Sequence, residues 1–208
     1  MRVRLMATLL MGLAAAGNAA EWEEKFRSEA VAVFARERPG TAVTELKAIG
    51  VVDAPPTAVF RLLGDYARYQ EIMPYTEESL VVRAEKGGEV VYVYSLVNAP
   101  LVSRRDYTLR IANETEWNGG RGFLRIRWTA SGEGPAPRKG IVRVKVNDGS
   151  WTLEPLDNGL KTRATYLLFT DPEGSLPTWV VNKANSSAIP DIFAALRKHA
   201  GELRYSDR

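Results

Sequence analysis

The sequence predicts an α+β fold in which one antiparallel sheet is covered by a long C-terminal helix. Residues 79–169 contain strand-like segments separated by turn sequences, among them residues 86–88 and 147–149. The spacers between these segments are short, which favours antiparallel hairpins over parallel crossovers. Residues 177–200 carry apolar side chains at intervals of about four residues, as amphipathic helices do. Because the apolar face of the sheet must be covered, we expect this helix to lie across it.

The first twenty residues have the pattern of a cleavable signal peptide. Arg2 and Arg4 precede an apolar run over residues 5–16, and small residues follow up to Ala19 and Ala20. A membrane anchor is the alternative, but the run is shorter than the about 20 apolar residues that cross a bilayer. We therefore expect residues 1–20 to be removed and residues 21–208 to form a single domain in the periplasm or outside the cell.

Composition excludes several classes of function. Without Arg2 and Arg4, 26 basic residues face 25 acidic ones, so the mature chain has no electrostatic footprint for nucleic acid. The absence of cysteine excludes disulfides, thiolate nucleophiles and thiolate metal sites. We expect no metal and no cofactor, and a monomer.

The N-terminal part of the predicted domain reads as helix, strand and two short helices. Residues 21–37 carry apolar side chains every four residues, which predicts an amphipathic helix. Residues 41–52 are rich in β-branched side chains and predict a strand. Asp53 and Asp65 are each expected to cap a short helix, the second of which ends at Pro74.

The central and C-terminal parts give the sheet and its covering helix. About six strands fit residues 79–169. Leu124, Ile126 and Trp128 alternate with polar residues, which indicates one apolar and one solvated face. Pro190 lies inside the predicted terminal helix and lacks a backbone donor, so we expect a kink or a loosened turn there.

Four stretches of this sequence resemble a known family. They are residues 103–107 (SRRDY), 137–143 (PRKGIVR), 149–153 (GSWTL) and 171–182 (DPEGSLPTWVVN). In this order and spacing they resemble the START (steroidogenic-acute-regulatory-protein-related lipid transfer) family. The resemblance implies a helix-grip fold, in which a curved antiparallel sheet wraps around the terminal helix, and a tunnel between them that holds one lipid.

The resemblance also implies which residues line that tunnel. They are the inward-facing residues of the sheet and the terminal helix: Tyr92, Tyr94, Arg105, Tyr107, Leu109, Ile111, Leu124, Ile126, Trp128, Val144, Ala184, Ala188 and Ile192. Alternation alone does not distinguish a lined cavity from a filled core, so the tunnel rests on the resemblance.

In sterol carriers of animal origin from this family, an acid and an arginine face each other inside the tunnel. Matched through the Arg105-Asp106 pair, these positions fall near Tyr94 and on Ile111, which carry no charge. The departure puts an animal-type sterol ligand in doubt. It implies a more apolar cavity that recognises polar groups through the hydroxyls of Tyr92, Tyr94 or Tyr107.

Two loops flank the tunnel in the family, and they correspond to residues 98–103 and 171–177. Their apolar residues suggest a gate that touches a membrane surface transiently, and the candidates are Leu101, Val102, Leu176 and Trp179. Alternatively these side chains pack against the terminal helix, which we favour for Trp179. Arg104, Arg105 and Asp106 are either a headgroup site, since guanidinium binds phosphate in bidentate fashion, or an arginine neutralised by Asp106.

No catalytic group stands out. The single histidine, His199, follows Lys198 near the end of the terminal helix and has no nearby nucleophile. The sequence therefore predicts a non-enzymatic protein that binds and carries or transfers one apolar lipid-type ligand. Two alternatives stay open. One is an enzyme of the aromatase or cyclase type on the same fold, and the other is an interaction module with a packed, ligand-free core.

Overall fold

The structure is a computed structural model that describes residues 20–118, 120–171, 173 and 177–205, apart from the side chains at positions 181, 184 and 185. Residues 1–19 of the predicted signal peptide and Leu176 of the predicted gate lie outside the described residues, and so does the side chain of Ala184. Within the described part, no helix combines the length and the apolarity that a membrane span requires.

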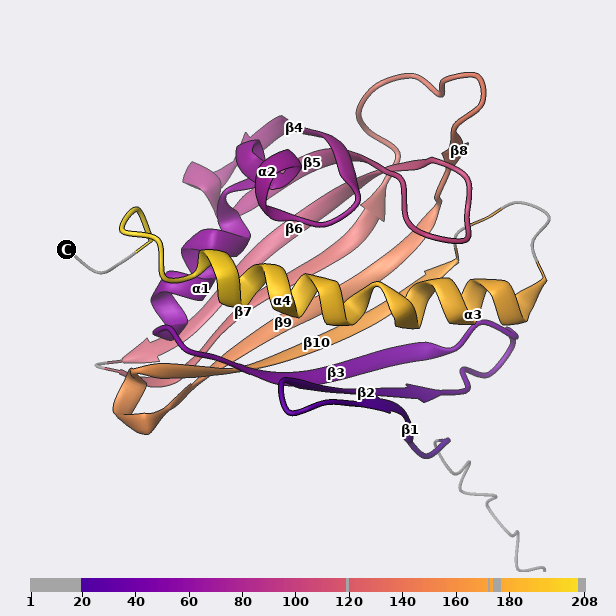
Figure 1. The fold of residues 1–208 in the computed structure, drawn as a ribbon. Coiled ribbons are helices and arrows are strands. Elements are labelled where there is room, and N and C mark those ends of the chain that lie inside the picture. Colours follow the sequence, from indigo (N-terminus) through magenta and orange to yellow (C-terminus); the bar gives the residue numbers. More distant parts are fainter. Residues whose placement is uncertain (1–19, 119, 172, 174–176, 206–208) are drawn as a thin grey trace, which may run out of the picture.

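One strongly curved sheet dominates the fold (Figure 1). Its strands follow the order β1-β2-β3-β10-β9-β7-β6-β5-β4, and all neighbours on this path are antiparallel. The strands are β1 (Glu23–Arg27), β2 (Val31–Arg36), β3 (Glu45–Val52), β4 (Thr76–Glu85), β5 (Val90–Val97), β6 (Arg105–Asn118), β7 (Arg121–Ser131), β8 (Val142–Arg143), β9 (Val146–Leu156) and β10 (Lys161–Asp171).

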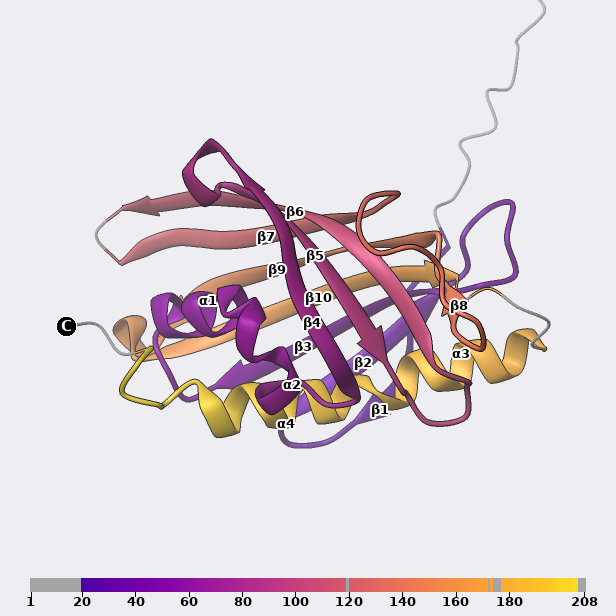
Figure 2. The same ribbon diagram turned by 90° about the horizontal axis from the view of Figure 1, so that it is seen from above.

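The helices lie on the concave side of the sheet. They are α1 (Pro56–Gly64), the 3-10 turn η1 (Tyr66–Arg68), α2 (Tyr69–Ile72), α3 (Thr178–Ser187) and α4 (Ile189–His199). Figures 1 and 2 show α3 and α4 running in line across the sheet, with α1 and α2 at the end where α4 terminates. Two further 3-10 turns, η2 (Lys86–Gly88) and η3 (Asp157–Gly159), close hairpins. This arrangement confirms the predicted α+β architecture.

The predicted helix over residues 21–37 was wrong, because the segment forms the hairpin β1–β2. Ser28 turns the chain: its hydroxyl accepts hydrogen bonds from the backbone N–H groups of Ala30 and Val31. β2 then pairs with β3 and buries Val31 and Val33. The four-residue spacing of apolar side chains did not reflect a helix, because the pairing of β2 with β3 determines the conformation of this segment.

Seven strands, rather than six, lie between residues 76 and 171. The additional one is β8, which pairs in parallel with the start of β6 at Arg105 and Asp106. A two-residue strand gives no periodicity that a sequence could show.

The helix caps differ in part from those predicted. Asp53 does not cap a helix, because α1 begins after Pro55 and has no side-chain cap. Asp65 occupies the N-cap position of η1, as predicted, but its side chain makes no capping hydrogen bond. Asp65 instead accepts a hydrogen bond from the hydroxyl of Tyr205, 2.8 Å away. Tyr205 is buried, and its hydroxyl also accepts a bond from Arg68 Nη1 at 2.7 Å. These bonds tie the segment after α4 to η1.

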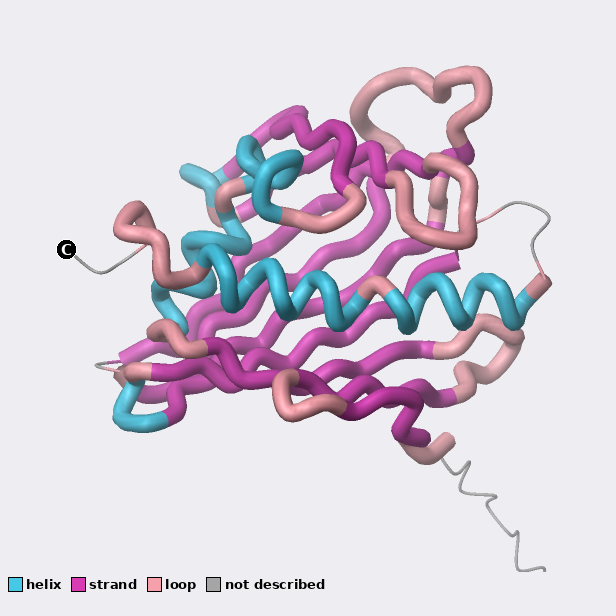
Figure 3. The backbone as a smooth tube through the Cα atoms, in the orientation of Figure 1, coloured by secondary structure: helices cyan, strands magenta, loops and turns pink. Residues whose placement is uncertain are grey.

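The terminal helix is broken where the proline predicts. Figure 3 shows the interruption between α3 and α4, which falls at Ala188. Pro190 lies in the first turn of α4, where its missing N–H removes no helical hydrogen bond.

Helix α4 approaches β3 closely because of one glycine. A Cβ at Gly50 would lie 2.6 Å from ring atoms of Phe193, so only a residue without a side chain fits. Phe193 and Leu196 are fully buried, and Arg197 Nε donates to the carbonyl of Val51 at 3.0 Å. The α4 half of the terminal helix is therefore anchored firmly on the sheet.

Candidate functional site

A cavity of about 260 Å³ lies between the concave face of the sheet and the helices α2 and α4. Nine of the residues that the sequence placed on a tunnel wall do line it: Arg105, Tyr107, Leu109, Ile111, Ile126, Trp128, Val144, Ala188 and Ile192. The sheet contributes from β4, β5, β6, β7, β9 and β10, so residues far apart in the sequence form one wall.

Three predicted wall residues lie elsewhere. Leu124 is buried in the core cluster that includes α1, and it does not reach the cavity. Tyr92 and Tyr94 lie on the opposite face of β5, where Arg83 stacks on Tyr92 at 4.2 Å and Tyr94 contacts Asp106. The prediction that these two tyrosine hydroxyls face the ligand was therefore wrong.

The error on β5 has a physical cause. The strand is buried on both faces over nearly its whole length, so the sequence VVYVYSLV shows no alternation from which to read the inward side. The loop over residues 132–141 packs on the outer face: Arg138 donates to the hydroxyl of Tyr94 at 2.5 Å and pairs with Glu78 at 2.9 Å. Val93, Ser95 and Val97 are the β5 residues on the cavity wall.

The wall also contains residues that sequence reasoning missed. They come from the segment between α1 and β4, from the β5–β6 loop, from β9 and β10 and from α4: Leu63, Tyr66, Tyr69, Met73, Pro74, Tyr75, Thr76, Ala99, Asn147, Trp151, Tyr166, Leu168, Thr170 and Ile189. For Tyr166 a signal existed, since Thr162, Ala164 and Tyr166 alternate with the polar residues Lys161, Arg163 and Thr165. For Met73 and Tyr75, in the turn before β4, the sequence gives no such signal, because only tertiary packing brings their side chains to the cavity wall.

Aromatic rings form the wall at the end near α1. Trp151 lies between Tyr166 and Phe193, with ring centroids 4.5 Å and 5.4 Å away, and Tyr166 stacks on Trp128 at 5.7 Å. Such contacts fix the rings and keep this part of the cavity rigid.

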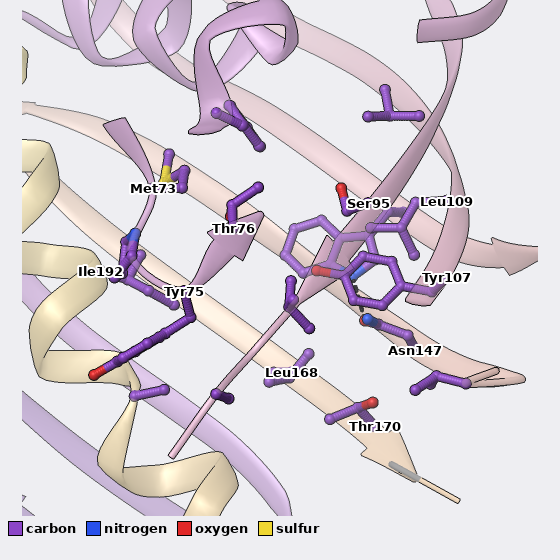
Figure 4. A pocket seen from close by; sticks show the side chains of 18 of the residues that line it. Met73, Tyr75, Thr76, Ser95, Tyr107, Leu109, Asn147, Leu168, Thr170 and Ile192 are labelled. Atoms are coloured by element: carbon purple, nitrogen blue, oxygen red, sulfur yellow. Dashed lines mark hydrogen bonds between the residues drawn. The ribbon is translucent and has the colours of Figure 1, made fainter. Parts of the chain in front are cut away.

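Polar side chains also line the cavity, and they are neutral with one exception. Figure 4 shows Ser95, Tyr107, Asn147 and Thr170 on one side of the cavity, away from Met73 and Tyr75. Burial raises the pKa of Tyr107 to about 12, so its hydroxyl stays protonated at neutral pH.

Arg105 is the exception. It is 4% exposed, and burial lowers the pKa of its guanidinium, which nevertheless keeps its charge. Its Nη1 donates to the carbonyl of Ser103 and, at 3.3 Å, to the hydroxyl of Ser103, while Nη2 donates to the carbonyl of Glu173 at 3.3 Å. Arg105 thus joins the β5–β6 loop to the segment after β10.

Asp106 faces the other side of β6 and forms an ion pair there. Arg143 donates to its two carboxylate oxygens at 2.7 and 2.9 Å, and Tyr94 donates at 3.1 Å. Asp106 therefore neutralises an arginine, as one of the two interpretations had it, but the partner is Arg143 rather than Arg104 or Arg105. Arg104 pairs with Glu77.

Two of the predicted gate residues are exposed. Leu101 is 62% exposed at a positive φ of 70°, and Trp179, in the first turn of α3, is 72% exposed. The interpretation that Trp179 packs against the terminal helix was therefore wrong. Val102, by contrast, lines the cavity. Figure 1 shows the β5–β6 loop and α3 at the same end of the sheet.

Three of the six described non-glycine residues with positive φ lie at this end of the site, and the other three lie in the hairpin turns η2 and η3. Tyr75, Leu101 and Glu173 all adopt positive φ, which is unfavourable for residues other than glycine. Tyr75 lines the cavity, and its hydroxyl donates to Asp191 on α4.

Among the residues that the structure describes, no group of three or more metal-ligating side chains occurs.

Comparison with known proteins assigns the family. The model of the START domain matches residues 5–206. The chain belongs to the START domain family. Phosphatidylcholine transfer protein of Homo sapiens is 26% identical over 178 residues, which are 84% of this chain and 81% of that protein. An uncharacterised protein of Pseudomonas aeruginosa is 24% identical over 202 residues, or 96% of each chain.

Solved structures agree with this START assignment and confirm the helix-grip fold. The STAR-related lipid transfer protein of Xanthomonas axonopodis has a TM-score of 0.76 and 26% identity, covering 87% of this chain and 99% of that one. Human StAR-related lipid transfer protein 5 has a TM-score of 0.76 at 19% identity, over 90% of this chain and 88% of that one. An aromatase/cyclase from Streptomyces also shares the fold, with a TM-score of 0.53 at 18% identity over 75% of this chain and 92% of that one.

The ion pair on β6 predicts a pH-dependent stability. Burial alone would raise the pKa of Asp106, but the hydrogen bonds and charge of Arg143 outweigh burial and hold that pKa below its ordinary value. The resulting stabilisation is present above about pH 4 and is lost as the pH falls through the lowered pKa. We expect Asp106→Asn to reduce the free energy of unfolding at pH 7 by about 3 kcal/mol, measured in urea.

The difference between wild type and Asp106→Asn shrinks as the pH falls below about 4, because protonated Asp106 resembles the variant. Glu114→Gln is the control: it removes an exposed pair with Arg127 and changes stability by about 0–1 kcal/mol. A difference for Asp106→Asn that stayed constant from pH 7 to pH 3 would contradict this assignment.

Proposed function

We propose that the protein binds one lipid-type molecule in the cavity and carries or transfers it between membranes. The observation that carries the proposal is a largely apolar cavity under the terminal helix of a START domain. Relatives named as phosphatidylcholine transfer protein and STAR-related lipid transfer protein support it. Covering apolar ligand surface favours binding by about 25 cal/mol per Å² before entropy is deducted, so tight binding needs few polar contacts.

The cavity argues against the interaction module with a packed core. Its volume of about 260 Å³ lies just below the roughly 300–1,000 Å³ typical of small-molecule pockets. A single-chain or compact ligand suits this volume, whereas a two-chain lipid requires that the cavity widen.

Lipid exchange at a membrane is favoured by the exposed side chains beside the cavity. Leu101 and Trp179 lie on the loop and the helix at one end of the sheet, and the same loop supplies Ala99 and Val102 to the wall. We propose that these exposed side chains enter the membrane surface while the lipid passes. Entry of a large apolar side chain into the interface offers the affinity that transient contact needs.

We propose a carrier rather than an enzyme. An aromatase or cyclase needs a proton donor or acceptor on the cavity wall whose pKa is tuned toward the working pH. Tyr107 and Arg105 are the described wall residues with proton-bearing groups near the polar side, and the pKa of Tyr107 is raised to about 12. Neither group is suited to proton transfer at neutral pH.

Filling the cavity tests the binding function. Leu109→Trp places a larger side chain on the wall, and we expect it to weaken binding of a fluorescent single-chain lipid analogue at least about ten-fold, which is 1.4 kcal/mol. Leu80→Trp is the matched control, since Leu80 is an exposed leucine of β4. Equal affinity of both variants and wild type, measured by titration, would contradict a ligand in this cavity.

Membrane contact makes a separate prediction. Leu101→Ser combined with Trp179→Ser is expected to lower affinity for vesicles at least about ten-fold in co-sedimentation, because burial of each apolar side chain is worth about 1.5–3 kcal/mol. Leu160→Ser is the control, since Leu160 is equally exposed but lies at the β9–β10 turn. If the control loses as much affinity as the double variant, this end of the molecule is not the contact.

We propose further that the protein acts in the periplasm or outside the cell as a monomer. The basic and apolar pattern of residues 1–20 supports export. We expect the protein expressed from its full sequence in its own host to occur outside the cytoplasm with a mass that lacks residues 1–19 or 1–20. Full-length protein confined to the cytoplasmic fraction would overturn export.

A further inference from the structure

The cavity wall is polar at one end and apolar at the other, and the strand register shows this division. On β5 and β6, Arg105 lies opposite Val97, Tyr107 opposite Ser95, and Leu109 opposite Val93. Residues two apart on a strand share a face, so these rows follow one another along the wall. The rows change from charged to hydroxyl-bearing to purely apolar along β6.

The neighbouring strands repeat the division. On β9 and β10, Asn147 lies opposite Thr170, and Trp151 opposite Tyr166 four residues further along. The indole N–H of Trp128 donates to the side-chain oxygen of Asn147 at 3.0 Å. The polar residues thus lie where β9 begins and β10 ends. This end is bounded by the β5–β6 loop, and we call it the loop end.

The opposite end of the cavity is apolar apart from tyrosine hydroxyls. Leu63 of α1, Ile111 and Ile126 line it, together with Trp151. The hydroxyl of Tyr69 donates to the carbonyl of Leu63 at 2.5 Å and is therefore occupied. Six residues of β6, from Arg105 to Ile111, separate the two ends, which corresponds to about 20 Å at 3.2–3.4 Å per residue. We call this end the helix end.

Charge adds a second asymmetry. Among the described wall residues, Arg105 is the sole formally charged side chain at neutral pH, and no aspartate or glutamate lines the cavity. The neighbouring acid, Asp106, points to the outer face of β6 and is held there by Arg143. The wall therefore carries one positive charge, at the loop end.

From this geometry we infer that the ligand is a single-chain amphiphile with an anionic head, a carboxylate or a phosphate monoester, which lies at Arg105 with its hydrocarbon chain toward α1. The inference rests on the proposed lipid-binding function and adds the chemical class and the orientation of the ligand. A guanidinium binds either anion with directed hydrogen bonds, and burial strengthens the attraction. Ser95, Tyr107 and Thr170 supply further hydroxyls beside the head.

Matched ligands test the chemical class on the unmodified protein. A long-chain fatty acid, its methyl ester and the alcohol of equal length differ only in the head, and a lysophosphatidic acid of equal chain length provides the phosphate arm. We expect the acid, the phosphate or both to bind at least about ten-fold more tightly than ester and alcohol in calorimetric titrations. The stronger of the two anions identifies the head.

Other outcomes separate this inference from the proposed function. If ester and alcohol bind as tightly as the acid and the phosphate, or phosphatidylcholine binds while single-chain ligands do not, the inference is overturned and the lipid-binding function stands. If none of these ligands binds, the proposed function itself fails.

Two arginines that follow one another provide a matched pair of variants. Arg105→Gln is expected to reduce the ratio of acid affinity to ester affinity to about one, and Arg105→Lys to retain part of the preference. Arg104→Gln is the control, because Arg104 is exposed and pairs with Glu77. A preference that survives in Arg105→Gln overturns the role of Arg105.

Because Arg105 also holds two loops, a variant there could unfold, and orientation is therefore measured on the wild type. Stearic acids carrying a nitroxide at carbon 5 or at carbon 16 broaden the NMR signals of nearby methyl groups. We expect the carbon-5 label to broaden Val97 and Val144, at the loop end, and the carbon-16 label to broaden Leu63, at the helix end. The reverse pattern overturns the inference with binding intact, whereas no broadening at any of these methyl groups counts against the proposed function.

Discussion

The packing of Phe193 on Gly50 and Trp151 is the contact on which the rest of the structure depends. It presses α4 against β3 at a point where any larger residue than glycine would collide with the phenyl ring. On one side of this contact Leu196 fills the space between helix and sheet, and on the other side Ala188 and Ile192 line a cavity. The terminal helix thus packs against the core at one end, through Leu196, and covers the cavity at the other, through Ala188 and Ile192.

The charges of β6 are separated by the geometry of the strand. Successive side chains point to opposite faces, so Arg105 faces the cavity while Asp106 faces outward. The loop over residues 132–141 and β8 cover Asp106 and supply Arg143 as its partner. Pairing the acid on the outer face leaves the wall positive, and the same alternation that builds a sheet thereby gives the cavity its polarity.

The well-anchored helix α4 and the strained backbone of Leu101 and Glu173 lie in different parts of the structure. The α4 half of the terminal helix is anchored by buried side chains, by Arg197 on backbone carbonyls and by Tyr205 on η1. Around the loop end, by contrast, Leu101 and Glu173 hold unfavourable backbone conformations, and Arg105 bridges the two segments that contain them. Residues held in strained conformations cluster where a structure binds or switches. The loop end is accordingly the part of the cavity best suited to ligand entry.

Much of this fold could be predicted from the sequence, because turn residues and short spacers set the order of the strands. The break at Pro190 was predictable from the missing backbone donor alone, and alternation on β6 and β7 placed Tyr107, Ile111 and Ile126 on the wall. The inward face of β5 was not predictable, since a strand buried on both sides has no polar face to mark it.

Two further misses have physical causes of the same kind. The hairpin at residues 23–36 depends on pairing with β3. The spacing of apolar side chains within residues 23–36 carries no information about that partner. Asn147 and Thr170 face the cavity because β9 and β10 pair in a particular register, which no single segment reveals. Where long-range pairing decides a side chain's environment, local patterns give no reliable signal.

The central claim is that the cavity of this START domain holds a lipid. Native mass spectrometry of the protein purified from its own host, followed by extraction and identification of the bound molecule, tests it most directly. The account predicts one lipid per protein chain. A protein that is empty as purified, and that stays empty after exposure to a broad panel of lipids, would contradict it.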